Sequence, residues 1–163
     1  WSPLAAHAPG SDPAFETAIT ACVSAVARLV HEGYTVDVVD SDGTLLIDPV
    51  EGGDDGEARA AAAGFATLRA RADDPARRVV PASAASLVGP VVVITGALET
   101  DDRAALGGVA HHCALPVLLV VGEHADLSAL RAGGWRAAVL RPGGDVAAAW
   151  DEAMDEGYAR VGR

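Results

Sequence analysis

The chain has 163 residues, half of them apolar, and a formal net charge of −11 at pH 7. It is about the size of one domain and has enough apolar residues for one core, which excludes an intrinsically disordered chain. All twelve basic residues are arginines and most are scattered, whereas a nucleic-acid-binding surface needs clustered Lys or Arg. We therefore expect a soluble domain without a nucleic-acid partner.

Cys22 and Cys113 both lie among apolar residues. This context is typical of buried free thiols in a reducing compartment, and it leaves a single disulfide open as the alternative. No apolar run approaches the roughly 18–20 residues that cross a bilayer, and no signal peptide is present. The sequence opens at Trp1 and its only Met is Met154, so we expect a piece of a longer protein.

A helix is predicted directly after a tail at residues 1–12. Ser11 and Asp12 can cap it, and Pro13 suits its first position. Apolar residues then recur at helical spacing as far as Gly33, which suits the residue after a helix end. This is the strongest helical signal in the chain.

A β-hairpin and a second helix are expected next. Residues 34–39 alternate in polarity, Asp42-Gly43 suits a tight turn, and residues 44–47 have the composition of a returning strand. Residues 57–71 form an Ala-rich helical pattern, and a short strand is expected at residues 78–80.

Three strand-helix units complete the chain. Their strands are predicted at residues 91–95, 116–121 and 136–140, and their helices start near residues 100, 126 and 145. Continuous apolar runs of this kind indicate strands covered on both faces, joined in parallel by right-handed crossovers. The predicted fold class is α/β: a mostly parallel, Rossmann-like sheet flanked by helices, with one antiparallel hairpin strand. One domain is expected over residues 13–157, between tails at 1–12 and 158–163.

The order of these elements, together with several short stretches, resembles the C-terminal part of the domain of unknown function 58 family, in its actinobacterial form. The matching stretches are Phe15-Glu16-Thr17-Ala18-Ile19, His31-Glu32-Gly33-Tyr34-Thr35-Val36, Ser41-Asp42-Gly43-Thr44, Ala132-Gly133-Gly134-Trp135-Arg136, Leu140-Arg141-Pro142-Gly143 and Ala148-Ala149-Trp150. They span roughly residues 12–152, and none of them is catalytic. The resemblance implies a fold similar to the von Willebrand factor A domain.

In that fold a central first strand precedes the capped helix and carries an Asp-x-Ser-x-Ser metal motif. Residues 1–12 contain neither such a strand nor the motif. A further metal-binding Asp follows the strand at residues 91–95, where this chain has Thr95-Gly96-Ala97. The resemblance therefore implies a piece that lacks the first strand, and at residues 95–97 the chain departs from the family's metal-binding pattern.

Parent proteins of the family often carry N-terminal transmembrane helices and are commonly encoded beside ATPases of the MoxR type. The resemblance thus implies a non-catalytic interaction or assembly module with a protein partner, for which it suggests a MoxR-type ATPase. It implies a cytoplasmic segment that a missing N-terminal part would tether to the membrane. The segment itself is not expected to insert into the membrane.

No catalytic, cofactor or metal residues are predicted. No Ser lies in a Gly-x-Ser-x-Gly pattern, and neither Cys lies in a redox or protease signature. The chain contains no Lys, which excludes a P-loop and also a receiver domain. His111-His112-Cys113 is interpreted as a helix C-terminus with Cys113 packed inward. Asp40, Asp42 and Asp48 are interpreted as turn residues rather than calcium ligands.

The carboxyl ends of the predicted strands give one weak candidate ligand rim. Ligands of open α/β sheets bind at these ends, and the rim residues are Thr95, Glu99, Asp101 and Glu123. Glu99 and Asp101 are equally well explained as first-turn acids of a helix. A small-molecule or divalent-metal-binding domain is thus the alternative function. An enzyme with unrecognised chemistry ranks below both.

Overall fold

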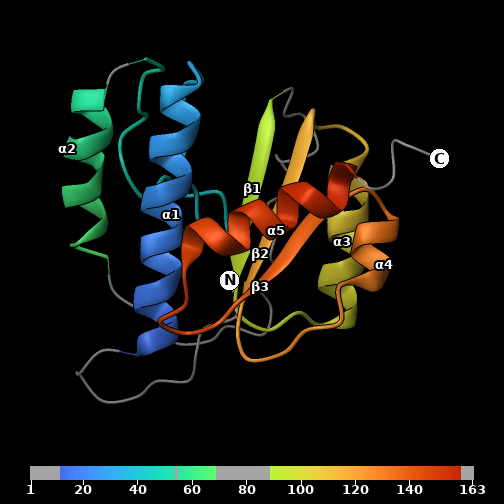
Figure 1. Ribbon diagram of the computed structural model, residues 1–163. Coiled ribbons are helices and arrows are strands. Elements are labelled where there is room, and N and C mark those ends of the chain that lie inside the picture. The colour runs from blue at the N-terminus through green and yellow to red at the C-terminus, as the bar shows by residue number, and fades with distance from the viewer. Residues whose placement is uncertain (1–11, 54, 69–88, 159–163) are drawn as a thin grey trace.

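The computed structural model describes residues 12–53, 55–68 and 89–158 (Figure 1). The elements are α1 (Pro13–His31), α2 (Asp55–Phe65), β1 (Pro90–Thr95), α3 (Thr100–Ala110), β2 (Leu115–Val121), α4 (Ser128–Ala132), β3 (Arg136–Leu140) and α5 (Val146–Tyr158). The three strands form a parallel sheet in the order β1-β2-β3. The predicted α/β character with parallel strands is confirmed. The strand expected at residues 78–80 lies outside the described residues, as do most of the two predicted tails.

β2 lies between its two neighbours and is covered on both faces. Its residues from position 116 to 121 are all buried. Because successive side chains of a strand point to opposite faces, β2 contributes to two separate cores. The first contains Val117, Leu119 and Val121, and the second contains Leu118 and Val120.

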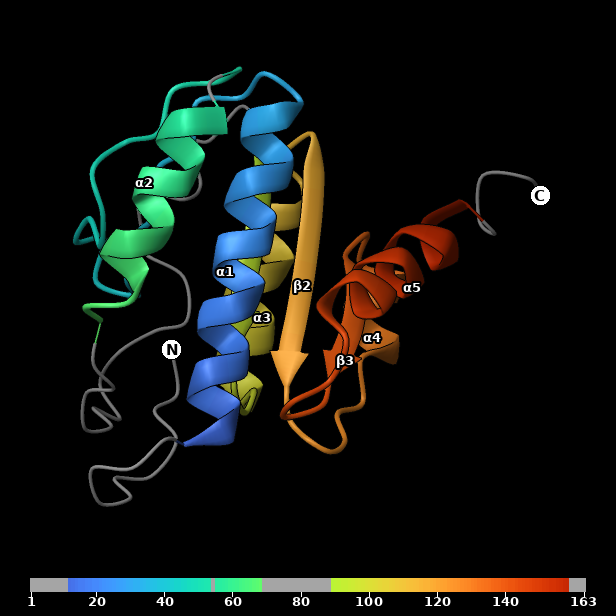
Figure 2. The same ribbon diagram turned by 60° about the vertical axis from the view of Figure 1, so that its left-hand side comes forward.

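The first core lies between the sheet and the helices α1 and α5. α1 contributes a stripe of small residues, Ala14, Ala18, Ala21 and Ala25, which allows the helix to approach the sheet closely. α5 contributes the buried indole of Trp150. α1 contacts β1 and β2, and α5 contacts β3 and β2; Figure 1 shows α1 beside β1, and Figure 2 shows α5 next to β3.

The second core lies on the opposite face, under α3 and α4. Leu106 of α3 and Leu130 of α4 pack there with Trp135, which precedes β3. The Trp135 indole donates a hydrogen bond to the Leu106 carbonyl oxygen at 2.9 Å. Trp135 and Trp150 are therefore both core residues.

α1 begins and ends as predicted. Asp12 has an extended backbone and its carboxylate accepts a hydrogen bond from the Ala14 N–H at 3.0 Å, with Pro13 at the first helical position. At the other end Gly33 has φ +91°, and the Tyr34 N–H donates to the Leu29 carbonyl. Only glycine adopts that φ without strain, so Gly33 ends the helix.

α1 is long and apolar enough, by length and composition, to cross a membrane. No uninterrupted apolar run indicates this in the sequence, because Glu16 and Arg28 lie among the apolar residues of α1. In the structure eight residues of α1 are buried, facing the sheet and a third core. Core helices of soluble proteins have the same length and apolar composition, so this feature alone does not indicate a membrane span.

The third core joins α1 to residues 34–50 and to α2. Val30 and Val36 are buried there with Phe65 of α2. The predicted hairpin is present only as two isolated antiparallel bridges, Val36 with Val50 and Val39 with Leu45. Val39 and Leu45 are exposed, so the tip of this segment has no core beneath it to stabilise a longer ladder.

A buried hydroxyl links α1 to the turn between β3 and α5. The Thr17 hydroxyl donates to the Pro13 carbonyl at 2.6 Å and accepts a hydrogen bond from the Gly143 N–H at 2.7 Å. Thr17 is buried, and Gly143 has φ +71° in the turn between β3 and α5. The contact fixes the first turn of α1 against the carboxyl end of β3.

Replacing Thr17 with Val should lower the free energy of unfolding by about 1–3 kcal/mol, because the partly buried Gly143 N–H would lose its acceptor. Urea denaturation measures this effect. Thr95→Val is the matched control: the Thr95 hydroxyl is also buried but has no hydrogen-bond partner, so its removal should leave stability unchanged or raise it. Equal losses for the two variants would contradict the assigned role of Thr17.

Candidate functional site

The predicted rim residues lie at the carboxyl ends of β1 and β2, in two different places. Thr95 ends β1, is 1 % exposed, and has an unpartnered hydroxyl. Glu99 is the N-cap residue of α3, and its N–H donates to the Asp102 carboxylate at 3.0 Å. Asp101 lies exposed in the first turn of α3, where an acid interacts favourably with the helix dipole. Glu123 lies apart from these three, in the loop after β2.

Glu123 lines an open hollow of about 780 Å³ between the β2–α4 loop, the β3–α5 loop and α5. Thr95, Glu99 and Asp101 do not line this hollow. The walls also carry Arg141 and three further acids, Asp126, Asp145 and Glu152. The structure therefore separates the rim into a group at the start of α3 and Glu123 in an acidic hollow.

Three acids of this hollow already have partners. Asp126 accepts hydrogen bonds from the Ser128 hydroxyl and N–H, which lower the pKa of its carboxyl group. Asp145 accepts from the Ala147 N–H at 2.9 Å in the first turn of α5. Glu152 pairs with Arg131. Within the described ranges, no three His, Cys, Asp or Glu side chains are arranged to hold a metal ion.

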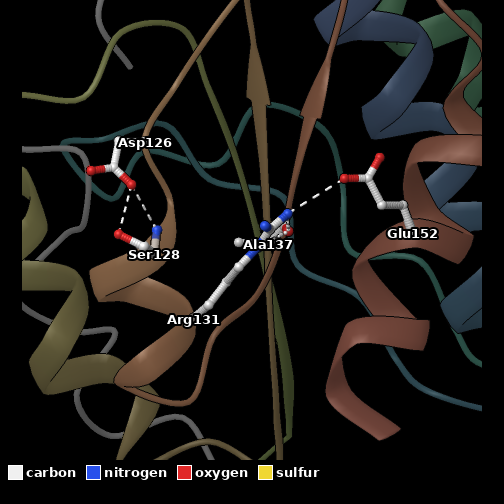
Figure 3. A network of polar contacts seen from close by, with 5 residues as sticks. All are labelled: Asp126, Ser128, Arg131, Ala137 and Glu152. Carbon is white, nitrogen blue, oxygen red and sulfur yellow. Dashed lines mark hydrogen bonds and ion pairs between the residues drawn. The ribbon is translucent and has the colours of Figure 1, made fainter. Parts of the chain in front are cut away.

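Arg131, at the end of α4, makes the most extensive polar contact near the hollow (Figure 3). Its Nε and Nη2 atoms donate to the Ala137 carbonyl of β3 at 2.9 and 2.7 Å. Nη2 also lies 3.4 Å from Glu152 Oε1 on α5. The Arg131 side chain, which is 24 % exposed, thus joins α4, β3 and α5.

The Ala137 carbonyl belongs to the outer edge of β3. The Gly122 N–H donates to the Leu140 carbonyl, so Leu140 directs its peptide groups toward β2. Successive residues of a strand alternate in this direction, so Ala137 and Val139 direct theirs away from β2. Arg131 therefore covers the outer edge of β3 with a charged side chain, a common way to prevent edge-to-edge pairing.

The two other sequence clusters have the predicted positions. His111 follows the end of α3, both histidines are exposed, and Cys113 packs against the second core. Asp40 accepts from the Ser41 N–H and Asp42 from the Thr44 N–H, as turn residues do. The interpretation of His111-His112-Cys113 as a helix end is confirmed, and so are turn contacts for Asp40 and Asp42.

Both cysteines are free thiols. Cys22 packs against the third core, and burial raises the pKa of its thiol from 9.0 to about 12. Burial also raises the pKa of Cys113, which a backbone hydrogen bond partly offsets. Neither sulfur is a thiolate near neutral pH, so neither is a ready nucleophile.

Two structural residues were missed in the sequence. Arg131 lacks any signal in the sequence, because its role depends on which way the Ala137 carbonyl points. Thr17 pairs with a peptide group 126 positions away, which no local pattern can indicate.

Comparison with known proteins finds no matching family model, no significantly similar curated protein and no significantly similar solved structure.

Replacing Arg131 with Ala should lower the free energy of unfolding by about 1–2 kcal/mol, since two charge-assisted hydrogen bonds of a partly exposed group are lost. It should also promote self-association, because the outer edge of β3 loses its cover. Urea denaturation and analytical ultracentrifugation measure the two effects.

Glu152→Gln is the matched control for Arg131→Ala. It removes only the exposed ion pair and should cost less than about 1 kcal/mol without changing the association state. If the two variants behave alike, the contact with Ala137 is not what stabilises this edge.

Alkaline pH should destabilise the protein through Cys22. The unfolded thiol loses its proton near pH 9 while the folded thiol keeps it up to about pH 12, so the free energy of unfolding falls across this window. The extra slope approaches about 1.4 kcal/mol per pH unit for one proton. Urea denaturation of the wild type and of Cys22→Ala from pH 8 to 10.5 should show a shallower slope for the variant. Parallel slopes would contradict the raised pKa.

Proposed function

We propose that this chain is a non-catalytic protein-interaction or assembly module with a Rossmann-like fold similar to the von Willebrand factor A domain. In this proposal it is part of a longer, membrane-linked bacterial protein of the domain of unknown function 58 family. The three parallel strands with helices on both faces are consistent with that fold. The family itself rests on the short stretches of sequence that resemble it.

The observation that carries the interaction role is the exposure of β1. Its residues from Pro90 to Ile94 are all partly exposed, whereas residues 116–121 of β2 are buried throughout. These β1 side chains are valine, isoleucine and proline, with no charge among them. An uncharged strand of mostly β-branched residues that is partly exposed is suited to contact with another chain.

The acids near the strand ends support binding less well. Three of these acids already have a structural role: Asp126 in a turn, Asp145 at the start of α5, and Glu152 in an ion pair. Glu123 is the hollow's remaining acid, and it lies apart from the rim residues of α3. The alternative function, small-molecule or divalent-metal binding at the strand ends, therefore ranks second.

The partner proposed by family resemblance is a MoxR-type ATPase. Biolayer interferometry with the immobilised chain and a purified MoxR-type ATPase from the same organism tests this partner, with and without Mg-ATP. We expect saturable binding to the wild type that is retained in Glu152→Gln, whose substitution lies away from β1. Absence of binding in both nucleotide states would remove this partner.

A thermal melt with Mg²⁺, Mn²⁺ or Ca²⁺ separates the interaction module from the metal-binding alternative. An ion at 100 times its dissociation constant would add about 2.7 kcal/mol of stability. The interaction module is expected to show no shift of the midpoint. A shift abolished by Glu123→Gln would favour the alternative instead.

A further inference from the structure

The thioether of Met154 on α5 lies against the guanidinium of Arg136, the first residue of β3. The Arg136 Nη1 atom donates to Met154 Sδ at 3.4 Å, and α5 packs along β3, next to which Figure 2 shows it. A thioether sulfur is a weak acceptor, whereas an arginine N–H forms its strongest hydrogen bonds with oxygen atoms that carry negative charge. The guanidinium at this sulfur would therefore bind an oxygen atom better than it binds the sulfur itself.

Met154 is also the sulfur best placed to react with an oxidant near neutral pH. It is the only methionine of the chain, and it is partly exposed where it packs against the first core. Thiols react with peroxides as thiolates, and burial raises the pKa of both Cys22 and Cys113. A thioether needs no ionisation in order to react, so the sulfur of Met154 should be oxidised before either thiol.

We infer that Met154 is a site of reversible oxidation by peroxides, and that Arg136 binds the oxygen of the resulting methionine sulfoxide. A lone pair of Sδ attacks one oxygen of hydrogen peroxide, the O–O bond breaks and an S–O bond forms. The hydroxide that leaves takes up the proton of the transferred oxygen and becomes water. The sulfur is oxidised by two electrons and the peroxide is reduced by two. This inference does not depend on the proposed interaction function.

The side chains can bring the new oxygen and the guanidinium together while α5 stays in place. Methionine has three rotatable bonds and a flexible side chain, and rotation about its Cγ–Sδ bond carries the oxygen around the sulfur. Arginine has five N–H donors, so Arg136 can bind the oxygen and keep its other contacts. The N–H···O bond formed in this way is charge-assisted and replaces a weak N–H···S contact.

The position of Met154 makes this partner necessary. Met154 packs against the first core one turn after Trp150 of the same helix. A sulfoxide is polar, and a polar group against a core is destabilising when it has no hydrogen-bond partner. With Arg136 beside it the oxygen is paired, so oxidation should change the contact between β3 and α5 without releasing the helix. Methionine sulfoxide reductases can then restore the thioether.

Treatment with hydrogen peroxide near neutral pH, followed by mass spectrometry after cleavage at arginine, tests the site. We expect one added oxygen atom on the peptide that contains Met154. Dithiothreitol should leave this oxygen in place, and methionine sulfoxide reductase should remove it. Met154→Leu is the matched control, because leucine keeps the apolar packing without the sulfur, and it should gain no oxygen that survives dithiothreitol. Oxidation of the cysteines or tryptophans before Met154 would overturn the assignment.

Urea denaturation of the reduced and the oxidised protein tests the role of Arg136. Arg136→Leu removes every N–H donor of the side chain and keeps apolar atoms beside Met154. We expect oxidation to raise the unfolding equilibrium constant about tenfold more in Arg136→Leu than in the wild type, the effect of one hydrogen bond to a charged, partly exposed group. Equal effects of oxidation on the two proteins would overturn the proposed role of Arg136.

The wild type alone decides the inference if Arg136→Leu does not fold. A paired oxygen predicts that the oxidised wild type still unfolds cooperatively, at a urea midpoint close to that of the reduced protein. An oxidised wild type that loses its cooperative transition has an oxygen without a partner at the core, and this result would overturn the inference. Met154→Leu treated with peroxide in the same way should keep its midpoint, which assigns any change in the wild type to Met154.

Discussion

The burial of β2 between two helix layers is the constraint on which the rest of the structure depends. Val117 and Leu119 face α1 and α5, while Leu118 and Val120 face α3 and α4. Burial of each such side chain contributes about 1.5–3 kcal/mol, and both layers must be in place for the strand to leave water. β1 and β3 extend the sheet on either side of β2, so they form its two outer edges.

The edges differ in a way that bears on function. Arg131 reaches across the outer edge of β3 and binds a carbonyl that would otherwise be free for another strand. β1 presents partly exposed valines and an isoleucine, and within the described part of the chain no charged side chain covers its edge in this way. Most of the acids at the carboxyl ends of the strands cap helices, form turns or make an ion pair with Arg131. The difference between the edges is the observation on which the proposed interaction function rests.

Much of the fold follows from local patterns. The continuous apolar run in β2 predicted burial on both faces, and Asp12, Pro13 and Gly33 predicted the ends of α1. The hairpin prediction was less successful, because alternation along residues 34–39 indicates a strand only where a core lies beneath it. Val36 and Val50 meet such a core, whereas Val39 and Leu45 do not.

The candidate site could be predicted only in outline. Sequence placed Thr95, Glu99, Asp101 and Glu123 at the carboxyl ends of strands, but it could not show that Glu123 lies in a separate hollow. The role of Arg131 depends on which peptide groups of β3 face away from β2, and therefore on strand register. Register is a property of the assembled sheet, and a strand's own residues do not encode which neighbour each peptide faces.

Amide hydrogen exchange of the free protein, followed by NMR, tests the central claim most directly. If β1 is an open edge of the sheet and β2 its centre, every second amide of β1 exchanges quickly while the amides of β2 remain protected. If the amides of β1 are as protected as those of β2, that edge is already covered and the exposure of β1 cannot carry the proposed interaction function.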